Sequence, residues 1–279
     1  TVILFSPLKS STMLRFYHPN HLLIALFSIP IFFVGCESDA DFSSPDGSSG
    51  TGGSLARFML AGDFMYLVDN TKIKTLNVAN PADPVLVNEQ TIAEGIESIF
   101  RLGERLFIGS STGLFLYTIG TDGLPVRQGE FLYENLNFEI YPCDPVVAND
   151  SLAFVTLNST IEVERCNRIT AMPVRQLNIF QVTDFQQPTM IAQYEMDNPQ
   201  GVGLDGNLLF VCENQYGLKV YDVSNPQDIQ LLAHLEDFTA HDVIPLNGLL
   251  LVVGTDNVYQ VDYSDLSNIR VVSKIPIGA

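Results

Sequence analysis

The sequence has no tryptophan, few basic residues and only four cysteines. Sugar-binding clefts commonly stack their ligand on aromatic faces, so the absence of Trp argues against a glycan-processing enzyme, although Tyr and Phe can substitute. Fourteen Lys and Arg stand against 32 Asp and Glu, a formal net charge of −18. Such a surface repels nucleic acid. No Cys-x-x-Cys pair is present, so we predict no metal site and no cofactor.

The first 35 residues contain no Asp or Glu. Lys9 and Arg15 precede an apolar run from Leu22 to Val34, which is too short for the roughly 20 residues that span a bilayer. A basic start followed by a short apolar run predicts a secretory signal over residues 1–35. Met13 begins a segment of more usual signal length, which leaves residues 1–12 as a candidate upstream stretch.

The apolar run ends in Phe-Val-Gly followed by Cys36. A small residue directly before this Cys resembles the lipobox of bacterial lipoproteins. The resemblance implies cleavage before Cys36 and acylation of its thiol, and two or three acyl chains anchor a protein stably. The alternative is an ordinary buried Cys after a signal peptide. Residues 36–54 are rich in Gly, Ser and Asp, which predicts a flexible tether.

The residues after Cys36 bear on localisation. Glu37 is not the Asp that commonly retains lipoproteins at the inner membrane, and the acidic stretch 37–41 resembles the surface-export signal of Bacteroidota lipoproteins. The simpler interpretation of this stretch is a solvated linker. We expect an outer-membrane lipoprotein, with the cell surface favoured and the periplasmic side as the alternative.

From Leu55 onward the chain repeats with a period near 40 residues, which indicates stacked supersecondary units. Each repeat carries a strand-like run at its centre. The last residues of these runs are Val78, Ile119, Val182, Val223 and Tyr263, spaced by 41, 63, 41 and 40 residues. The long interval places an insertion at about residues 158–175.

Each repeat also opens with a short apolar run before a turn rich in Gly, Asn and Asp, as hairpins prefer. Four antiparallel strands per repeat make one propeller blade. We therefore predict an all-β fold over residues 55–279, a five-bladed β-propeller of four-stranded antiparallel blades. We expect the ring to be closed, since closure satisfies the end blades, and the propeller to be monomeric.

The repeat Gly217–Pro226 reads Gly-Leu-Lys-Val-Tyr-Asp-Val-Ser-Asn-Pro, and residues 72–84 follow the same pattern. These segments resemble the LVIVD repeat of bacterial and archaeal surface proteins. The resemblance covers nearly all of the chain after the signal. It implies a propeller at the cell surface, and it transfers no active site because that family shares no catalytic residues.

Alignment of the repeats on their first turns places polar residues at one position of the expected channel mouth. These residues are Arg57, Ser98, Asp144, Gln200 and Asp242, with His241 beside the last. Converging polar side chains can hold a small ligand or a cation. The simpler interpretation is a water-filled channel mouth. His241 can serve metal or acid–base chemistry, but no second His occupies an equivalent place.

The insertion supplies a second candidate, a loop carrying Arg165, Arg168 and Arg175. Arg binds carboxylates bidentately, so this loop can recognise an acidic partner. The alternative is that these cations pair with nearby acids of the chain. Cys143 and Cys166 are expected at the same end of blade three, where an exported protein can join them in a disulfide. Cys212 lies in an apolar run and is predicted to be a buried free thiol.

The favoured function is a non-catalytic binding or scaffold module, held at the membrane by its lipid, with a protein or glycan partner. One alternative is a glycan-processing hydrolase, which needs two carboxylates flanking the scissile bond. Asp144 and Asp242 are the axial candidates for that role. A further alternative is an accessory subunit of an outer-membrane uptake complex.

Overall fold

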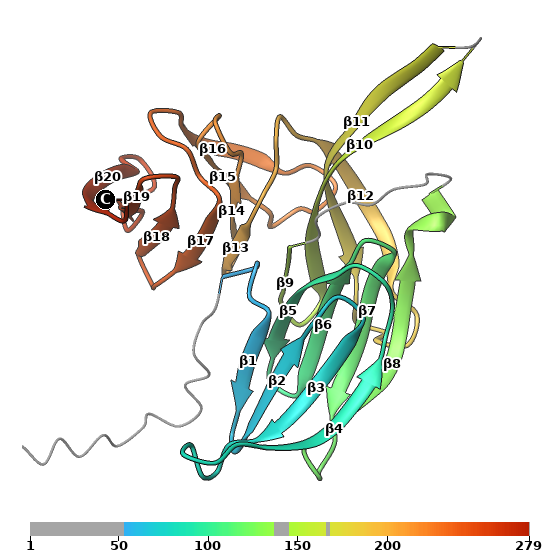
Figure 1. The fold of residues 1–279 in the computed structure, drawn as a ribbon. Coiled ribbons are helices and arrows are strands. Elements are labelled where there is room, and N and C mark those ends of the chain that lie inside the picture. Colours follow the sequence, from blue (N-terminus) through green and yellow to red (C-terminus); the bar gives the residue numbers. More distant parts are fainter. Residues whose placement is uncertain (1–52, 137–144, 166–167, 279) are drawn as a thin grey trace, which may run out of the picture. The chain divides into compact units, whose positions relative to one another are not determined.

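The computed structural model describes residues 53–136, 145–165 and 168–278. Regular structure in these ranges is β-strand apart from one short 3₁₀-helix, η1 (Tyr133–Leu136). The strands form five antiparallel sheets of four, each ordered as in the sequence (Figure 1). The chain is thus a β-propeller with five four-stranded blades, as the repeats predict. In the described ranges, no helix has the length and hydrophobicity needed to cross a membrane.

The strands of each blade run outward in sequence order. Blade one contains β1 (Phe58–Ala61), β2 (Phe64–Val68), β3 (Lys72–Asn77) and β4 (Val85–Thr91). Blade two contains β5 (Ile96–Leu102), β6 (Arg105–Ser110), β7 (Gly113–Ile119) and β8 (Pro125–Leu132). Blade three contains β9 (Val146–Ala148), β10 (Leu152–Arg165), β11 (Arg168–Gln181) and β12 (Thr189–Glu195).

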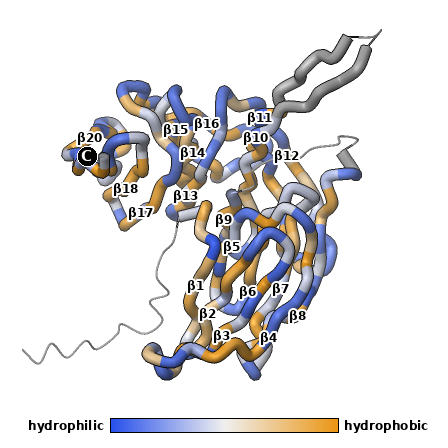
Figure 2. Tube along the Cα trace, in the orientation of Figure 1, coloured by the Kyte–Doolittle hydropathy of each residue, from blue (hydrophilic) through white to orange (hydrophobic). Residues whose placement is uncertain are grey.

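The last two blades follow the same plan. Blade four contains β13 (Val202–Asp205), β14 (Leu208–Cys212), β15 (Leu218–Asp222) and β16 (Gln230–Leu235). Blade five contains β17 (Asp242–Pro245), β18 (Leu249–Val253), β19 (Asn257–Asp262) and β20 (Arg270–Pro276). Figure 2 shows hydrophobic stretches in inner strands such as β1 and β2 and hydrophilic residues in many of the connecting loops. Strands such as β14 and β18 are apolar at every position, and adjacent blades cover both faces of β14.

The first hairpin of most blades depends on a residue with positive φ. Gly62, Gly103 and Gly206 adopt φ values of 55°, 58° and 57° at equivalent turns, and Asn247 adopts 48°. Two-residue hairpin turns need this left-handed backbone to match the twist of the strands, and Gly and Asn accept it at least cost. Local sequence therefore sets where each inner hairpin reverses.

A β-bulge recurs at the same place in all five blades. The register between the third and fourth strands shifts once in each, leaving one residue of the outer strand unpaired. The unpaired residues are Val87, Gln128, Ile191, Leu232 and Val272. A bulge increases the local twist. The shared position shows that the blades are copies of one structural unit.

The core consists of four apolar clusters, one at each junction between successive blades. The first strands show the pattern clearly, because Ile99, Val146, Val202 and Val243 occupy one equivalent position and are at most 1% exposed. Each of these side chains is covered by the preceding blade. The equivalent residue of blade one, Phe58, is 58% exposed.

The expected ring closure takes an unexpected form. Successive inner strands pack together from β1 through β17, but no fifth apolar cluster joins blade five to blade one within the described ranges. The segment leading into β1 makes the connection instead. Ser54 Oγ donates a hydrogen bond to Asp242 Oδ1 (3.2 Å) and accepts one from the Val202 amide (2.7 Å). Hydrogen bonds at the inner end thus link blade five to the start of blade one, while the apolar faces of these two blades do not pack together.

The insertion in blade three is a paired ribbon rather than the loop expected from sequence. β10 and β11 are each 14 residues long and stay in antiparallel register out to the pair Arg165 and Arg168. Figure 1 shows this hairpin extending past the other strands of its blade. Polar and apolar residues alternate from Thr160 to Glu164, a pattern typical of strands.

Candidate functional site

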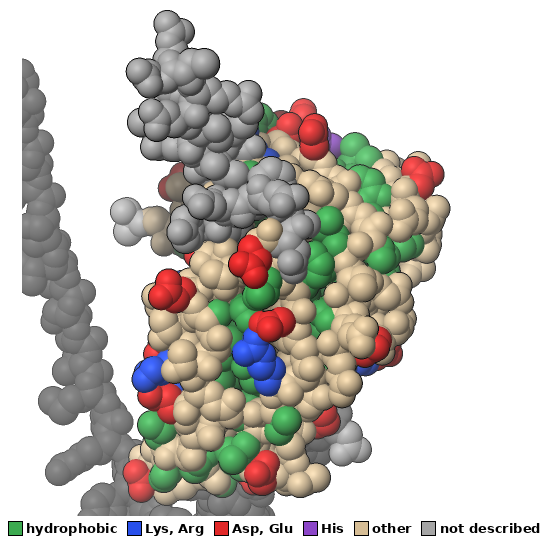
Figure 3. Space-filling view, turned by 90° about the vertical axis from the view of Figure 1, so that its right-hand side faces the viewer, with side chains coloured by type: hydrophobic (Ala, Val, Ile, Leu, Met, Phe, Trp, Pro, Cys, Tyr) green, Lys and Arg blue, Asp and Glu red, His purple; other side chains and the backbone are tan. Residues whose placement is uncertain are grey.

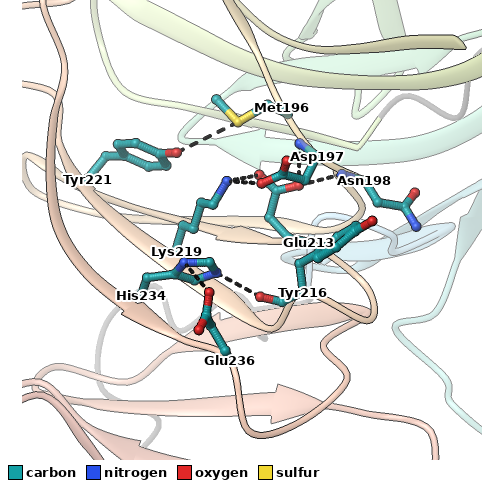
Figure 4. A network of polar contacts seen from close by, with 9 residues as sticks. All are labelled: Met196, Asp197, Asn198, Glu213, Tyr216, Lys219, Tyr221, His234 and Glu236. Carbon is teal, nitrogen blue, oxygen red and sulfur yellow. Dashed lines mark hydrogen bonds and ion pairs between the residues drawn. The ribbon is translucent and has the colours of Figure 1, made fainter.

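A buried carboxylate organises the loops at one end of blade four. Glu213, just after β14, has no solvent exposure, and its Oε1 accepts a hydrogen bond from Lys219 Nζ at 3.1 Å. Its Oε2 accepts the main-chain N–H groups of Asp197 (3.0 Å) and Asn198 (2.6 Å). Figure 4 shows these groups converging from the loop before β13, the loop after β14 and strand β15. These hydrogen bonds offset the free-energy cost of burying the carboxylate.

Lys219 holds a second carboxylate in the same network. Its Nζ lies 2.6 Å from Asp197 Oδ2, and only 12% of the Lys219 side chain is exposed. The Lys219 hydrogen bond is the main cause that lowers the pKa of Asp197. Burial lowers the pKa of Lys219, but Asp197 and Glu213 outweigh it and the net shift is upward. Both shifts favour the charged forms of Asp197 and Lys219, and the network fixes the loop onto blade four.

Amide side chains extend this network to the base of the insertion. Asn158, in β10, donates through Nδ2 to Asn198 Oδ1 (2.6 Å) and to the Pro199 carbonyl (2.9 Å). Asn198 Nδ2 in turn donates to Gln215 Oε1 (2.7 Å). Arg175, opposite Asn158 in the hairpin, is exposed and contributes in a smaller measure to the low pKa of Asp197. The result is an ordered polar surface where the ribbon meets blade four, which we name the ribbon-base surface.

Blade one contains a simpler version of the same device. Lys74 in β3 and Asp69 after β2 occupy the positions of Lys219 and Glu213, and their side chains lie 2.9 Å apart. Hydrogen bonds from the main chain at Thr71 and from Lys74 lower the pKa of Asp69 to about 2. The recurrence indicates a structural role for this acid and lysine pair. Sequence reasoning missed it, although a Lys inside an apolar strand was a usable signal.

The channel-mouth residues are not all equivalent in the structure. Strand pairing aligns Arg57, Ser98 and Asp242 with Pro145 and Gly201, because each lies one residue before the equivalent first-strand position. In blade four, the alignment used Asp205 as the first turn residue, but Asp205 still pairs with Leu208 at the end of β13. Gln200 therefore precedes the aligned position by one residue. Asp144 lies outside the described residues.

Asp242 is engaged by the chain itself. Its carboxylate accepts hydrogen bonds from Ser54 Oγ and from the Val243 amide (2.9 Å), and from the main chain at Ser54 and Leu55. Burial raises its pKa, and these hydrogen bonds oppose the rise. A Cβ on Gly201 would lie 2.3 Å from Asp242 Oδ1, so only glycine fits beside it. The carboxylate joins blade five to the start of blade one.

Comparison with known proteins supports the propeller fold. No family model and no curated protein matches the sequence. Solved propeller-like structures do match. A Lactobacillus plantarum protein is 15% identical, with a TM-score of 0.59 over 77% of this chain and 69% of that one. The periplasmic gluconolactonase PpgL of Pseudomonas aeruginosa is 12% identical, with a TM-score of 0.56 over 78% and 68% of the two chains.

A third match, AztD of Citrobacter koseri, is 12% identical with a TM-score of 0.50, covering 78% of this chain and 63% of that chain. These propellers are therefore longer than the part of this chain that matches them. At such identities the similarity shows the fold alone. Function has to be argued from the residues of this propeller.

The other residues predicted at the channel mouth differ in exposure and in their contacts. Ser98 is fully buried, Arg57 is exposed, and the Gln200 carbonyl accepts Thr156 Oγ1 at 2.6 Å. His241 Nε2 lies 3.1 Å from Thr255 Oγ1. Among the described residues, no three His, Cys, Asp or Glu side chains are grouped as metal ligands.

The cysteines are partly outside the described ranges. Cys212 is a buried free thiol, as predicted, and burial raises its pKa well above the usual value. Cys36, Cys143 and Cys166 lie outside those ranges, so the acylation and the disulfide stay predictions. Arg165 and Arg168 are described for their backbone only, as the last pair of the ribbon.

One cavity at the opposite end of the blades was not foreseen. It has a volume of about 270 Å³ and lies where turns of blades one and two meet, next to Asp63, Arg101 and Glu104. Arg101 Nη1 donates to the Leu60 carbonyl (3.3 Å), and its Nη2 lies 3.7 Å from Glu104 Oε1. These two contacts engage only part of the guanidinium, since Arg101 Nε is buried without a hydrogen-bond partner among the described residues.

Proposed function

We propose that this chain is an exported lipoprotein whose propeller binds a protein or glycan partner without catalysing a reaction. Its lipid on Cys36 would hold it at the outer membrane, with the cell surface as the favoured side. The observation that carries the proposal is the engagement of the axial carboxylate. Asp242 accepts hydrogen bonds from Ser54 and from the main chain before β1, so it has a structural task in holding the start of blade one to blade five.

The ribbon-base surface supports a binding role. Rigid strands position it, and its amides and carboxylates are fixed by hydrogen bonds, so little side-chain entropy would be lost on binding. Arg175 adds an exposed cation on an otherwise acidic chain. Figure 3 shows acidic side chains spread over the face that it presents, with fewer basic ones. The Arg175 guanidinium can bind a carboxylate of a partner bidentately.

The anchor is tested by metabolic labelling with a fatty-acid analogue. We expect the full chain to be labelled, the Cys36→Ser variant to be unlabelled and the matched Cys212→Ala variant to keep its label. Labelling that persists in Cys36→Ser would exclude acylation at this residue.

The binding role is tested by crosslinking in intact cells. Arg175→Glu should reduce recovery of the crosslinked partner, whereas the control Arg270→Glu, at the exposed ion pair with Asp262, should not. The hydrolase alternative predicts instead that Asp242→Asn abolishes turnover on a glycan panel while the fold is kept. Turnover that is present in the parent chain and lost in this variant would replace the binding proposal.

A further inference from the structure

Blade one and blade five each present an apolar face that meets no other blade. The incoming face of blade one comprises Phe58, Met65, Leu67, Leu76 and Val78, all partly or largely exposed. The residues at the same positions in blade five are Val243, Leu250, Val252, Val261 and Tyr263, which are 0 to 4% exposed. The difference arises because blade four covers blade five, whereas no blade covers the incoming face of blade one.

The outgoing face of blade five is the counterpart. It comprises Leu251, Val253, Val258 and Gln260, all partly exposed. The residues at these positions in blade four are Phe210, Cys212, Leu218 and Val220, and each is fully buried against blade five. The chain therefore has one unused incoming face and one unused outgoing face.

Side-chain size indicates that these two faces fit each other. At all four formed junctions an aromatic residue of the outgoing face shares a cluster with a β-branched residue of the incoming face. The pairs are Tyr66 with Ile99, Phe107 with Val146, Phe154 with Val202, and Phe210 with Val243.

At the unused faces the sizes are exchanged. The outgoing position carries Leu251 and the incoming position carries Phe58. An exchange of a large and a small side chain across a contact conserves the total volume, which is the change that a packed core tolerates best. Against the faces found at the four formed junctions, Phe58 would meet an aromatic residue and Leu251 would meet a β-branched one, so the volumes would not be matched.

We propose that the incoming face of blade one receives the outgoing face of blade five from a second copy of this chain. Closure within one chain would change the angles of four junctions whose central residues are fully buried, while a second copy docks without altering them. The contact is head-to-tail, with different faces on the two partners. This contact is an alternative to the monomer expected from the sequence.

Sedimentation velocity of the full chain in a mild non-ionic detergent tests this contact. The parent chain should sediment above the monomer mass, and more so as its concentration rises. Phe58→Asp and Val253→Asp should each reduce it to the monomer. The control Val126→Asp, at a 48% exposed position on β8, should still associate. If Val253→Asp fails to fold by circular dichroism, Val258→Asp replaces it.

The decisive step is to mix the two monomeric variants. Each retains one intact face, so a head-to-tail contact predicts a dimer of Phe58→Asp with Val253→Asp and no larger species. A mixture that stays monomeric, or a parent chain that is monomeric throughout, would overturn the proposal in favour of closure within one chain. Association that survives both substitutions would overturn it by placing the contact elsewhere.

Discussion

Replacement of Lys219 by Met should destabilise the propeller strongly, because it leaves Glu213 buried without its counter-ion. Loss of one partner from a buried pair costs about 3–5 kcal/mol. Two main-chain N–H groups still solvate Oε2 of Glu213, so we expect the lower end, about 3 kcal/mol. For a domain of this size that corresponds to a decrease of roughly 6–12 °C in Tm.

Thermal melts followed by circular dichroism measure this change. The matched control is Lys72→Met, which removes an exposed ion pair with Glu89 and should cost less than about 1 kcal/mol. The double variant Glu213→Gln with Lys219→Met should regain part of the loss, since a neutral amide replaces the isolated carboxylate. Equal melting temperatures for Lys219→Met and its control would refute the argument that the buried ion pair of Lys219 with Glu213 stabilises the fold more than an exposed pair does.

Three further outcomes follow from the same contacts. Ser54→Ala removes the donor to Asp242 and should lower the free energy of unfolding by about 1–3 kcal/mol in urea melts; an unchanged midpoint would contradict the proposed connection. Gly201→Ala places a Cβ 2.3 Å from that carboxylate and should lower Tm, whereas Gly278→Ala, in open surroundings, should not. The pKa of Asp69 is depressed to about 2, so its stabilisation is present above the ordinary pKa and lost as pH falls toward 2. A carbon-detected NMR titration with a midpoint near 4 for this carboxyl would contradict the hydrogen bonds described.

The blades could be predicted because the repeats carry their own boundaries. Each inner hairpin reverses at a short turn, usually with a Gly or Asn of positive φ, and the central strands end at fixed intervals. The register of single residues was harder to predict. Asp205 has a residue type common in turns but pairs with Leu208, so Gln200 of blade four was aligned one residue too early. Residue types common in turns also occur at strand ends, and only the hydrogen-bonded strand pairing shows whether such a residue belongs to the turn or to the strand.

The polar network was not predictable from spacing. Glu213 lies in a loop, and its partners Asp197 and Lys219 come from the preceding connection and the next strand. Only the folded blade brings these three groups together. The role of Asp242 was likewise hidden, since Ser54 is 188 residues away in sequence.

The bulge shared by the five outer strands has a consequence for solubility. A flat, regular edge invites pairing with the strand of a neighbouring molecule, and β4, β16 and β20 expose apolar residues along theirs. The unpaired residue twists each rim and interrupts the row of free main-chain groups in the middle. Five such bulges therefore disfavour edge-to-edge pairing between neighbouring molecules.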